Sequence, residues 1–156
     1  MPAPAISHLI CTTALIMLIF MIPAFSSMVL NNISSDMEQR ELKEVADYVS
    51  NTLANLCFLV NSTGSGQVSL EKEMIYLPSA IENSIYVLKI VDSGGNASKV
   101  TAYLKGRPST VADAWLLPGL KVDVKNSVES GGRTVVIGCA RNSSIVSVWI
   151  TYADAG

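Results

Sequence analysis

The sequence is poor in charged, aromatic, histidine and cysteine residues. Charged residues make up 15% of the 156-residue chain and aromatic residues 6%, and there are one histidine and three cysteines. The formal net charge is −2, so the chain lacks the basic excess typical of proteins that bind nucleic acid. The three cysteines have no metal-site spacing. We therefore expect no nucleic-acid contact and no bound metal.

The chain also lacks the residue patterns of known catalytic sites. No phosphate-binding P-loop, GxSxG nucleophile motif or paired-cysteine motif is present. The single histidine, His8, lies at the start of an apolar run, where an interfacial or packed imidazole is expected rather than a base. The glycine pairs at 94–95 and 131–132 precede no helix and are expected at hairpin tips. We predict that the protein is not an enzyme and needs no cofactor.

What is present first is a long uncharged segment. Residues 6–30 contain no Asp, Glu, Lys or Arg. As a helix, this segment reaches about 37 Å at ~1.5 Å per residue, which exceeds the roughly 30 Å hydrocarbon core of a bilayer. Three interpretations remain open: a retained membrane helix, a secretory signal with a cleavage site at Ala24-Phe25-Ser26, or a hydrophobic helix that forms a filament core after leaving the membrane.

A second helical pattern follows the apolar segment with only a short polar patch between them. Apolar residues recur at helical spacing, and most of the charged residues lie off this stripe. The stripe consists of Leu42, Val45, Ala46, Val49, Leu53 and Leu56. We predict one hydrophobic, then amphipathic helix over residues 1–56, as a first domain.

From residue 57 the periodicity changes to that of β-structure. Residues 57–60 are interpreted as a first strand, residues 84–92 alternate between an apolar and a mixed face, and residues 143–153 form a last strand that we expect to be central or against the helix. Residues 107–119 are expected to be irregular or a short helical turn, and the tips at 93–96 and 130–132 to join hairpins. Seven or so strands predict a sandwich or open barrel over residues 57–156. The fold class is therefore α+β, with a long N-terminal hydrophobic helix and an antiparallel β-sandwich head.

Two sets of residues are candidates for modification. Four Asn-x-Ser/Thr triplets lie C-terminal to the apolar segment, and three fall in or beside predicted turns. We expect glycosylation at one or more of Asn32, Asn61, Asn96 and Asn142, with the head outside the cell. If the head is extracellular, Cys57 and Cys139 are candidates for a disulfide, the alternative being two separate buried thiols.

Two stretches resemble a known family. The sequence AISHLI followed by an apolar helix, and the segment YLPSAIENSIYVLKI, are similar to archaeal type IV pilins and archaellins. Together they cover about half of the chain. The family's leader usually carries Lys or Arg before its cleavage site, whereas the first five residues here contain neither.

The resemblance implies a structural subunit of an extracellular filament. Such subunits are inserted in the membrane before assembly, polymerise with copies of themselves through the N-terminal helix, and present glycosylated heads outside, with a role such as cell adhesion at a surface layer or host surface. The residues that this assigns to polymerisation are Leu9, Leu15, Ile16, Leu18, Ile19, Phe20 and Ile22. The alternatives are a single-pass membrane-anchored β-sandwich that binds the cell-surface layer, like an archaellum stator component, and a secreted domain released after Ser26.

Overall fold

The computed structural model describes residues 3–64 and 67–153. Met1 and Pro2, in the predicted N-terminal helix, and Ser65, Gly66 and residues 154–156, in the predicted head, lie outside this range. The chain begins with helix α1, Ala3–Ser62. Within this described range eight strands follow it, and the chain divides into two compact units, residues 1–37 and 38–156. Helix α1 contributes residues to both units, and the second unit also contains every strand.

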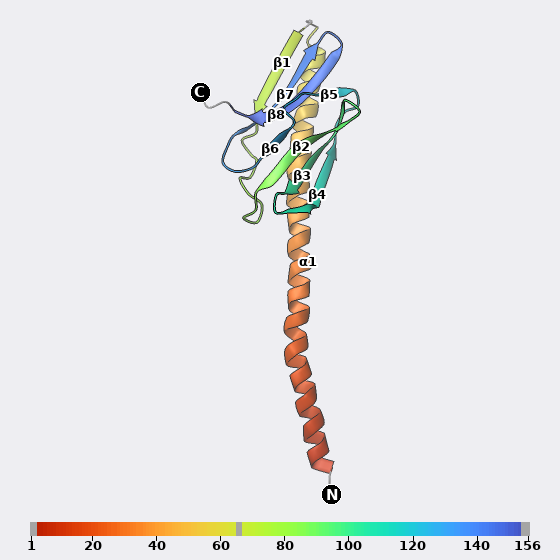
Figure 1. Cartoon of the computed structure of the whole chain (residues 1–156), viewed down its shortest axis with the longest axis vertical. Helices are drawn as coiled ribbons and strands as arrows, with labels where there is room; N and C mark the ends of the chain where they lie inside the picture. Colours follow the sequence, from red (N-terminus) through yellow and green to blue (C-terminus); the bar gives the residue numbers. More distant parts are fainter. Residues whose placement is uncertain (1–2, 65–66, 154–156) are drawn as a thin grey trace. The chain divides into compact units, whose positions relative to one another are not determined.

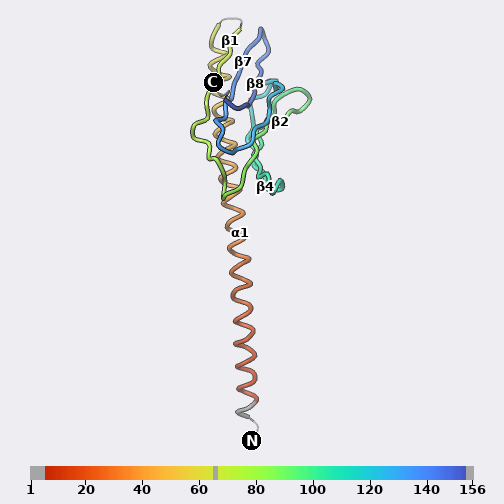
Figure 2. Tube along the Cα trace, turned by 60° about the vertical axis from the view of Figure 1, so that its left-hand side comes forward, coloured from red at the N-terminus to blue at the C-terminus, as the bar shows by residue number. Residues whose placement is uncertain are grey.

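The eight strands form one hydrogen-bonded sheet. They are β1 (Gln67–Glu73), β2 (Tyr86–Ser93), β3 (Asn96–Leu104), β4 (Arg107–Trp115), β5 (Leu120–Val122), β6 (Ser127–Glu129), β7 (Val135–Asn142) and β8 (Ile145–Tyr152). The order is β1-β7-β8-β5-β3-β2-β6, with β4 paired to β3. All pairs are antiparallel except β5 with β8. Figures 1 and 2 show β1, β7 and β8 side by side. The predicted α+β class, with a long apolar helix and a sheet head, is confirmed.

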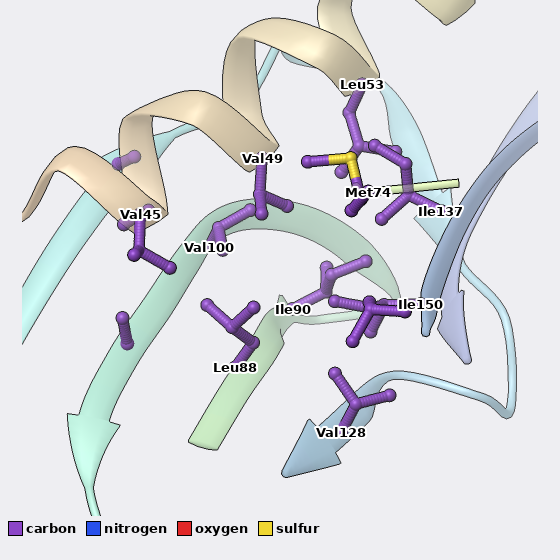
Figure 3. Close-up of a cluster of buried hydrophobic side chains, with 14 of the residues drawn as sticks. Val45, Val49, Leu53, Met74, Leu88, Ile90, Val100, Val128, Ile137 and Ile150 are labelled. Carbon is purple, nitrogen blue, oxygen red and sulfur yellow. The ribbon is translucent and has the colours of Figure 1, made fainter. Parts of the chain in front are cut away.

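The core of the second unit lies between α1 and the sheet. The predicted helical stripe is buried, with Leu42, Ala46, Val49 and Leu53 all at 0% exposure. Figure 3 shows side chains of the stripe directed toward those of the strands, among them Leu88, Ile90, Val100 and Ile150. The stripe is apolar at i, i+3, i+4 and i+7, so one face of the helix packs against the sheet. The helix is therefore an integral part of the head's core.

The helix extends beyond the predicted end at Leu56. Cys57–Val60, interpreted from the sequence as a strand, are helical, and α1 ends at Ser62. Cys57 and Val60 are both 0% exposed, whereas Phe58 is 72% exposed. Cys57 and Val60 follow Leu53 by four and seven residues, so they continue the buried helical stripe. A short apolar run was mistaken for a strand because its period was considered without the preceding helix.

The structure of residues 107–119 also differs from the prediction of an irregular segment or a short helical turn. Its first nine residues form β4, with Ala112 and Ala114 buried. Among the described strands β4 pairs with β3 alone, and a register shift lies between Tyr103 and Leu104. Pro108 is compatible with this strand because a proline is tolerated on an edge strand or beside an irregularity. Because of Pro108 this segment was not predicted to be a strand, although Ala112 and Ala114 face the core.

The two glycine tips have different outcomes. Gly94 and Gly95, at φ of 67° and 88°, join the paired strands β2 and β3 as expected. Residues 130–132 do not form a hairpin, because β6 pairs with β2 whereas β7 pairs with β1 and β8. The last strand, β8, lies between β7 and β5, which confirms its predicted central position.

Helix α1 also covers the free edge of β4. The Lys43 ammonium donates to the Asp113 carbonyl at 2.6 Å, and the Ser50 hydroxyl donates to the Trp115 carbonyl at 2.6 Å. Alternate carbonyls of an edge strand point away from its partner strand and would otherwise be open to pairing with another chain. Two helical side chains thus bind the edge and fix the position of β4 beside the helix.

Candidate functional site

The predicted polymerisation residues lie in the first unit, and all of them are exposed. Their exposed fractions run from 51% for Ile16 to 73% for Phe20. Because successive helical residues are about 100° apart, the set covers just over half of the helix circumference. Ile6, Ile10, Met17 and Met21, which are also exposed, cover the rest. The helix Ile6–Ser62 contains a window long and apolar enough to cross a membrane, and none of that window is buried in the structure. A helix that is apolar all round requires an apolar environment.

Polar side chains within this segment are satisfied by the helix itself. The Thr12 hydroxyl donates to the His8 carbonyl at 2.7 Å, and the Thr13 hydroxyl donates to the Leu9 carbonyl at 2.8 Å. This back-bonding leaves neither hydroxyl group unpaired in an apolar environment. The helix continues through Pro23. These two threonines are therefore compatible with burial in lipid or among other helices.

The four sequon asparagines are exposed and lie at different places. Asn32 lies in the first unit, Asn61 in the last turn of α1, Asn96 at the start of β3 and Asn142 at the end of β7. Two of them lie at one end of the second unit: Arg141 donates to the Asn61 carbonyl at 3.5 Å, and Asn142 accepts from Gln67 at 3.3 Å. Every candidate asparagine is thus accessible, and glycosylation stays a prediction.

The candidate disulfide cysteines lie together in the core. The Cys57 and Cys139 sulfur atoms are 3.0 Å apart without a covalent bond, and both residues are 0% exposed. The contact joins the end of α1 to β7. The hydrogen bond with Cys57 and burial hold the pKa of the Cys139 thiol above its usual value. The geometry brings the predicted partners into contact, and the disulfide itself stays a prediction.

A groove that the sequence did not predict lies beside α1 in the second unit. It has a volume of about 390 Å³ and is lined by Glu41, Glu44, Val45, Tyr48, Tyr76, Leu77 and Pro78. Tyr76 is 82% exposed. The buried Tyr86 hydroxyl donates to the Pro78 carbonyl at 2.6 Å and so fixes the loop that carries Tyr76. Burial raises the pKa of Tyr86 to about 12, so this donor stays protonated at neutral pH.

A second exposed aromatic residue lies at the end of β4. Trp115 is 77% exposed, and Leu117, two residues further on, is 46% exposed. Lys99 is the cross-strand partner of Trp115. Large exposed apolar side chains that cluster mark interaction surfaces more often than scattered ones do. Trp115 and Tyr76 share one feature that could have indicated them in the sequence: each directly precedes a Leu-Leu-Pro or Leu-Pro loop and falls outside the apolar helical stripe.

The Lys99 ammonium and a neighbouring carboxylate form a charged cluster beside Trp115. The Asp113 carboxylate accepts from the Lys99 ammonium at 2.6 Å and from the Thr101 hydroxyl at 2.7 Å. Burial opposes ionisation of Asp113, but these hydrogen bonds and the charges of Lys99 and Lys43 outweigh it and hold the pKa of Asp113 below its usual value. These contacts hold Lys99 and Lys43 beside the end of β4.

The described residues offer no other evident chemistry. Within residues 3–64 and 67–153, no group of three or more His, Cys, Asp or Glu side chains is placed to hold a metal ion. A hollow of about 370 Å³ lies beside the groove and is lined in part by Ser130, Arg133 and Thr134. No family model, curated protein or solved structure matches the chain. The candidate site is therefore the apolar helix together with the exposed aromatic surfaces of the second unit.

Proposed function

We propose that this protein is a pilin-like structural subunit of an extracellular filament. It is inserted in the membrane before assembly and polymerises with copies of itself through Leu9, Leu15, Ile16, Leu18, Ile19, Phe20 and Ile22. The head then lies outside the cell and carries glycans on its sequon asparagines. Contact with a cell surface or surface layer is the corresponding role.

One observation supports this proposal most strongly. The apolar side chains of residues 6–30 are exposed around the whole helix, whereas the later residues of the same helix are the core of a folded unit. A membrane anchor requires only the first property, and it can be joined to its domain by any linker. In a subunit that assembles through its helix, a helix that is also part of the head's core has an advantage. Packing of the helices then constrains the position of each head.

Assembly moves these side chains from one apolar environment to another. Lipid and neighbouring helices are similarly apolar, so helix–helix packing must supply the preference for the filament. A charged side chain in the middle of the segment is costly in both environments, at about 2.5–3.5 kcal/mol at the centre of a membrane helix. In a filament that cost is repeated in every subunit.

The test is electron microscopy of the purified full-length protein and of Ile16→Asp and Leu18→Lys variants. Wild type should form filaments and both variants should not, with head folding unchanged by circular dichroism. Asn51→Asp, an exposed polar position of the same helix, is the matched control and should assemble. Filaments from Ile16→Asp would refute the proposal. Wild-type protein that stays monomeric or dimeric after detergent removal would instead indicate the single-pass anchored binding protein.

A further inference from the structure

Helix α1 has a polar segment between its uncharged part and its buried part. Residues 31–37 (NNISSDM) follow the uncharged segment and directly precede Glu38, which is 1% exposed. Six of these seven residues are exposed, and Ser34 is half-buried. The division of the chain into two compact units falls at the end of this segment, after Met37. None of its residues belongs to the buried core described for the head.

The amino acids of this segment are poor helix formers. Five of the seven are Asn, Ser or Asp, whose side chains compete for backbone hydrogen bonds and favour caps and turns over a helix interior. Ile33 is β-branched and loses rotamer freedom in a helix. Most helical stability in proteins comes from tertiary packing rather than from propensity. Residues 31–37 are helical as part of α1, but their composition and exposure make this the least stabilised stretch of the helix after the uncharged segment.

The environment of this segment changes when the proposed subunit assembles. The uncharged helix before it, about 37 Å long, already exceeds the roughly 30 Å hydrocarbon core, so residues 31–37 of the inserted subunit lie among headgroups or in water. Water there competes for the backbone groups of an exposed helix. In a filament, Ile33 and Met37 are available to neighbouring helices, because both are 51% exposed and they lie one turn apart on one face.

We propose that residues 31–37 are a hinge in the membrane-inserted subunit and become a stable helix on assembly. In the inserted subunit the segment opens locally, so that the head changes direction while the uncharged helix stays in the membrane. In the filament, packing on Ile33 and Met37 holds the segment helical and fixes the head. Hinges are a few residues whose backbone angles absorb a large change. The ordering on assembly rests on the proposed filament, whereas the hinge requires only membrane insertion.

The first experiment measures amide hydrogen exchange of the full-length protein in detergent micelles, followed by mass spectrometry of its peptides. Amides of residues 31–37 should exchange about a thousandfold faster than those of the buried stripe, because local opening costs much less than opening of the head. In assembled filaments their exchange should slow by roughly tenfold or more. Protection in micelles equal to that of the stripe would overturn the hinge.

A triple variant, Asn31→Ala with Ser35→Ala and Asp36→Ala, tests the physical cause. Alanine is the best helix former, so the three substitutions should slow exchange of the segment in micelles by about tenfold to thirtyfold. The variant keeps the sequon at Asn32. Asn51→Ala, at an exposed position of the same helix within the head, is the matched control and should leave exchange of the segment unchanged. Unchanged exchange in the triple variant would refute the proposal that composition opens the hinge.

The outcomes separate this inference from the proposed function. Rapid exchange of residues 31–37 in both micelles and filaments would overturn the ordering on assembly and leave the filament proposal intact. Wild-type protein that forms no filament would overturn the proposed function, and with it the ordering on assembly. The exchange measured in micelles would then still decide the hinge.

Discussion

The head should fold only when it includes the amphipathic part of α1. Five large stripe residues, Leu42, Val45, Val49, Leu53 and Leu56, are each at most 7% exposed in the second unit. A fragment of residues 57–156 lacks all five. Burial of one such side chain contributes about 1.5–3 kcal/mol. The loss is therefore about 8–15 kcal/mol, which equals the whole net stability of a typical domain, about 5–15 kcal/mol.

The same truncation also exposes the edge of β4. Lys43 and Ser50 bind the carbonyls of Asp113 and Trp115 in the complete unit. Without the helix these carbonyls would be open to pairing with another chain, and the apolar face of the sheet would be uncovered. We expect the fragment 57–156 to be aggregation-prone as well as unfolded.

The assay compares fragments 38–156 and 57–156. The longer fragment should give a cooperative thermal transition by circular dichroism and a dispersed amide spectrum by nuclear magnetic resonance. The shorter one should give neither and should bind a dye that reports exposed apolar surface. A matched pair within the longer fragment, Val49→Asp against Asn51→Asp, separates burial from charge, and only the first should unfold. A cooperative transition from 57–156 would refute the reasoning, because the strands would then form a core of their own.

Three further predictions concern the strands. Gly138→Ala should lower the free energy of unfolding by about 1–3 kcal/mol in denaturant titrations, because an added Cβ would overlap the Trp149 ring. Oxidation of Cys57 and Cys139, 82 residues apart, to a disulfide should raise the free energy of unfolding by up to about 4.5 kcal/mol, because the cross-link reduces the chain entropy of the unfolded state. The free energy of unfolding is measured with and without a reducing agent. Asp113→Asn should reduce the loss of stability on acidification: a folded pKa below the unfolded one stabilises the fold above about pH 4, and this contribution disappears as the pH falls through the folded pKa.

Each of these has a control. Gly106→Ala adds a Cβ with no heavy atom within 4 Å and should be tolerated. For the cysteines, Cys139→Ala should abolish any dependence of stability on the reducing agent, and dependence that persists would exclude this pair as its source. For the acid titration, Asp36→Asn lies in the first unit and should leave the head's profile unchanged. A profile equally steep in Asp113→Asn would show that other carboxylates control it.

Elements whose periodicity is local could be predicted from the sequence. The stripe from Leu42 to Leu56 repeats over four turns, and β2 alternates so that Tyr86, Leu88 and Ile90 are buried while Lys89 is exposed. Such patterns predict the face as well as the element. The predictions failed for segments whose structure depends on a neighbouring element. Cys57–Val60 continue a helix that begins far upstream, and β4 is a strand because it pairs with β3.

The candidate site divides in the same way. The apolar helix and the sequons are features of contiguous sequence, so they were found without a structure. The groove brings Glu41 and Glu44 together with Tyr76, which lies more than thirty residues away in the sequence. Trp115 lies beside α1 only because β4 runs along the other side of the helix. No spacing rule connects residues that are brought together by the packing of a helix on a sheet, so these surfaces require the tertiary structure.

One buried charged residue precedes the buried stripe. Glu38 lies one turn before Leu42, is 1% exposed and accepts from Arg107 at the start of β4, while its second carboxylate oxygen has no hydrogen-bond partner. A buried, half-satisfied carboxylate costs stability, so packing alone does not explain it. The two turns of α1 before Glu38 are mostly polar, with Asn31, Asn32, Ser35 and Asp36 among their residues, so Glu38 lies where the polar patch meets the buried stripe. Because its carboxylate accepts from Arg107 on β4, we infer that this ion pair helps to set the register of the helix against the sheet, in the way that a polar core residue sets the register of a coiled coil. A shift of the helix by one turn would break this pair and place Glu38 in the position of Leu42.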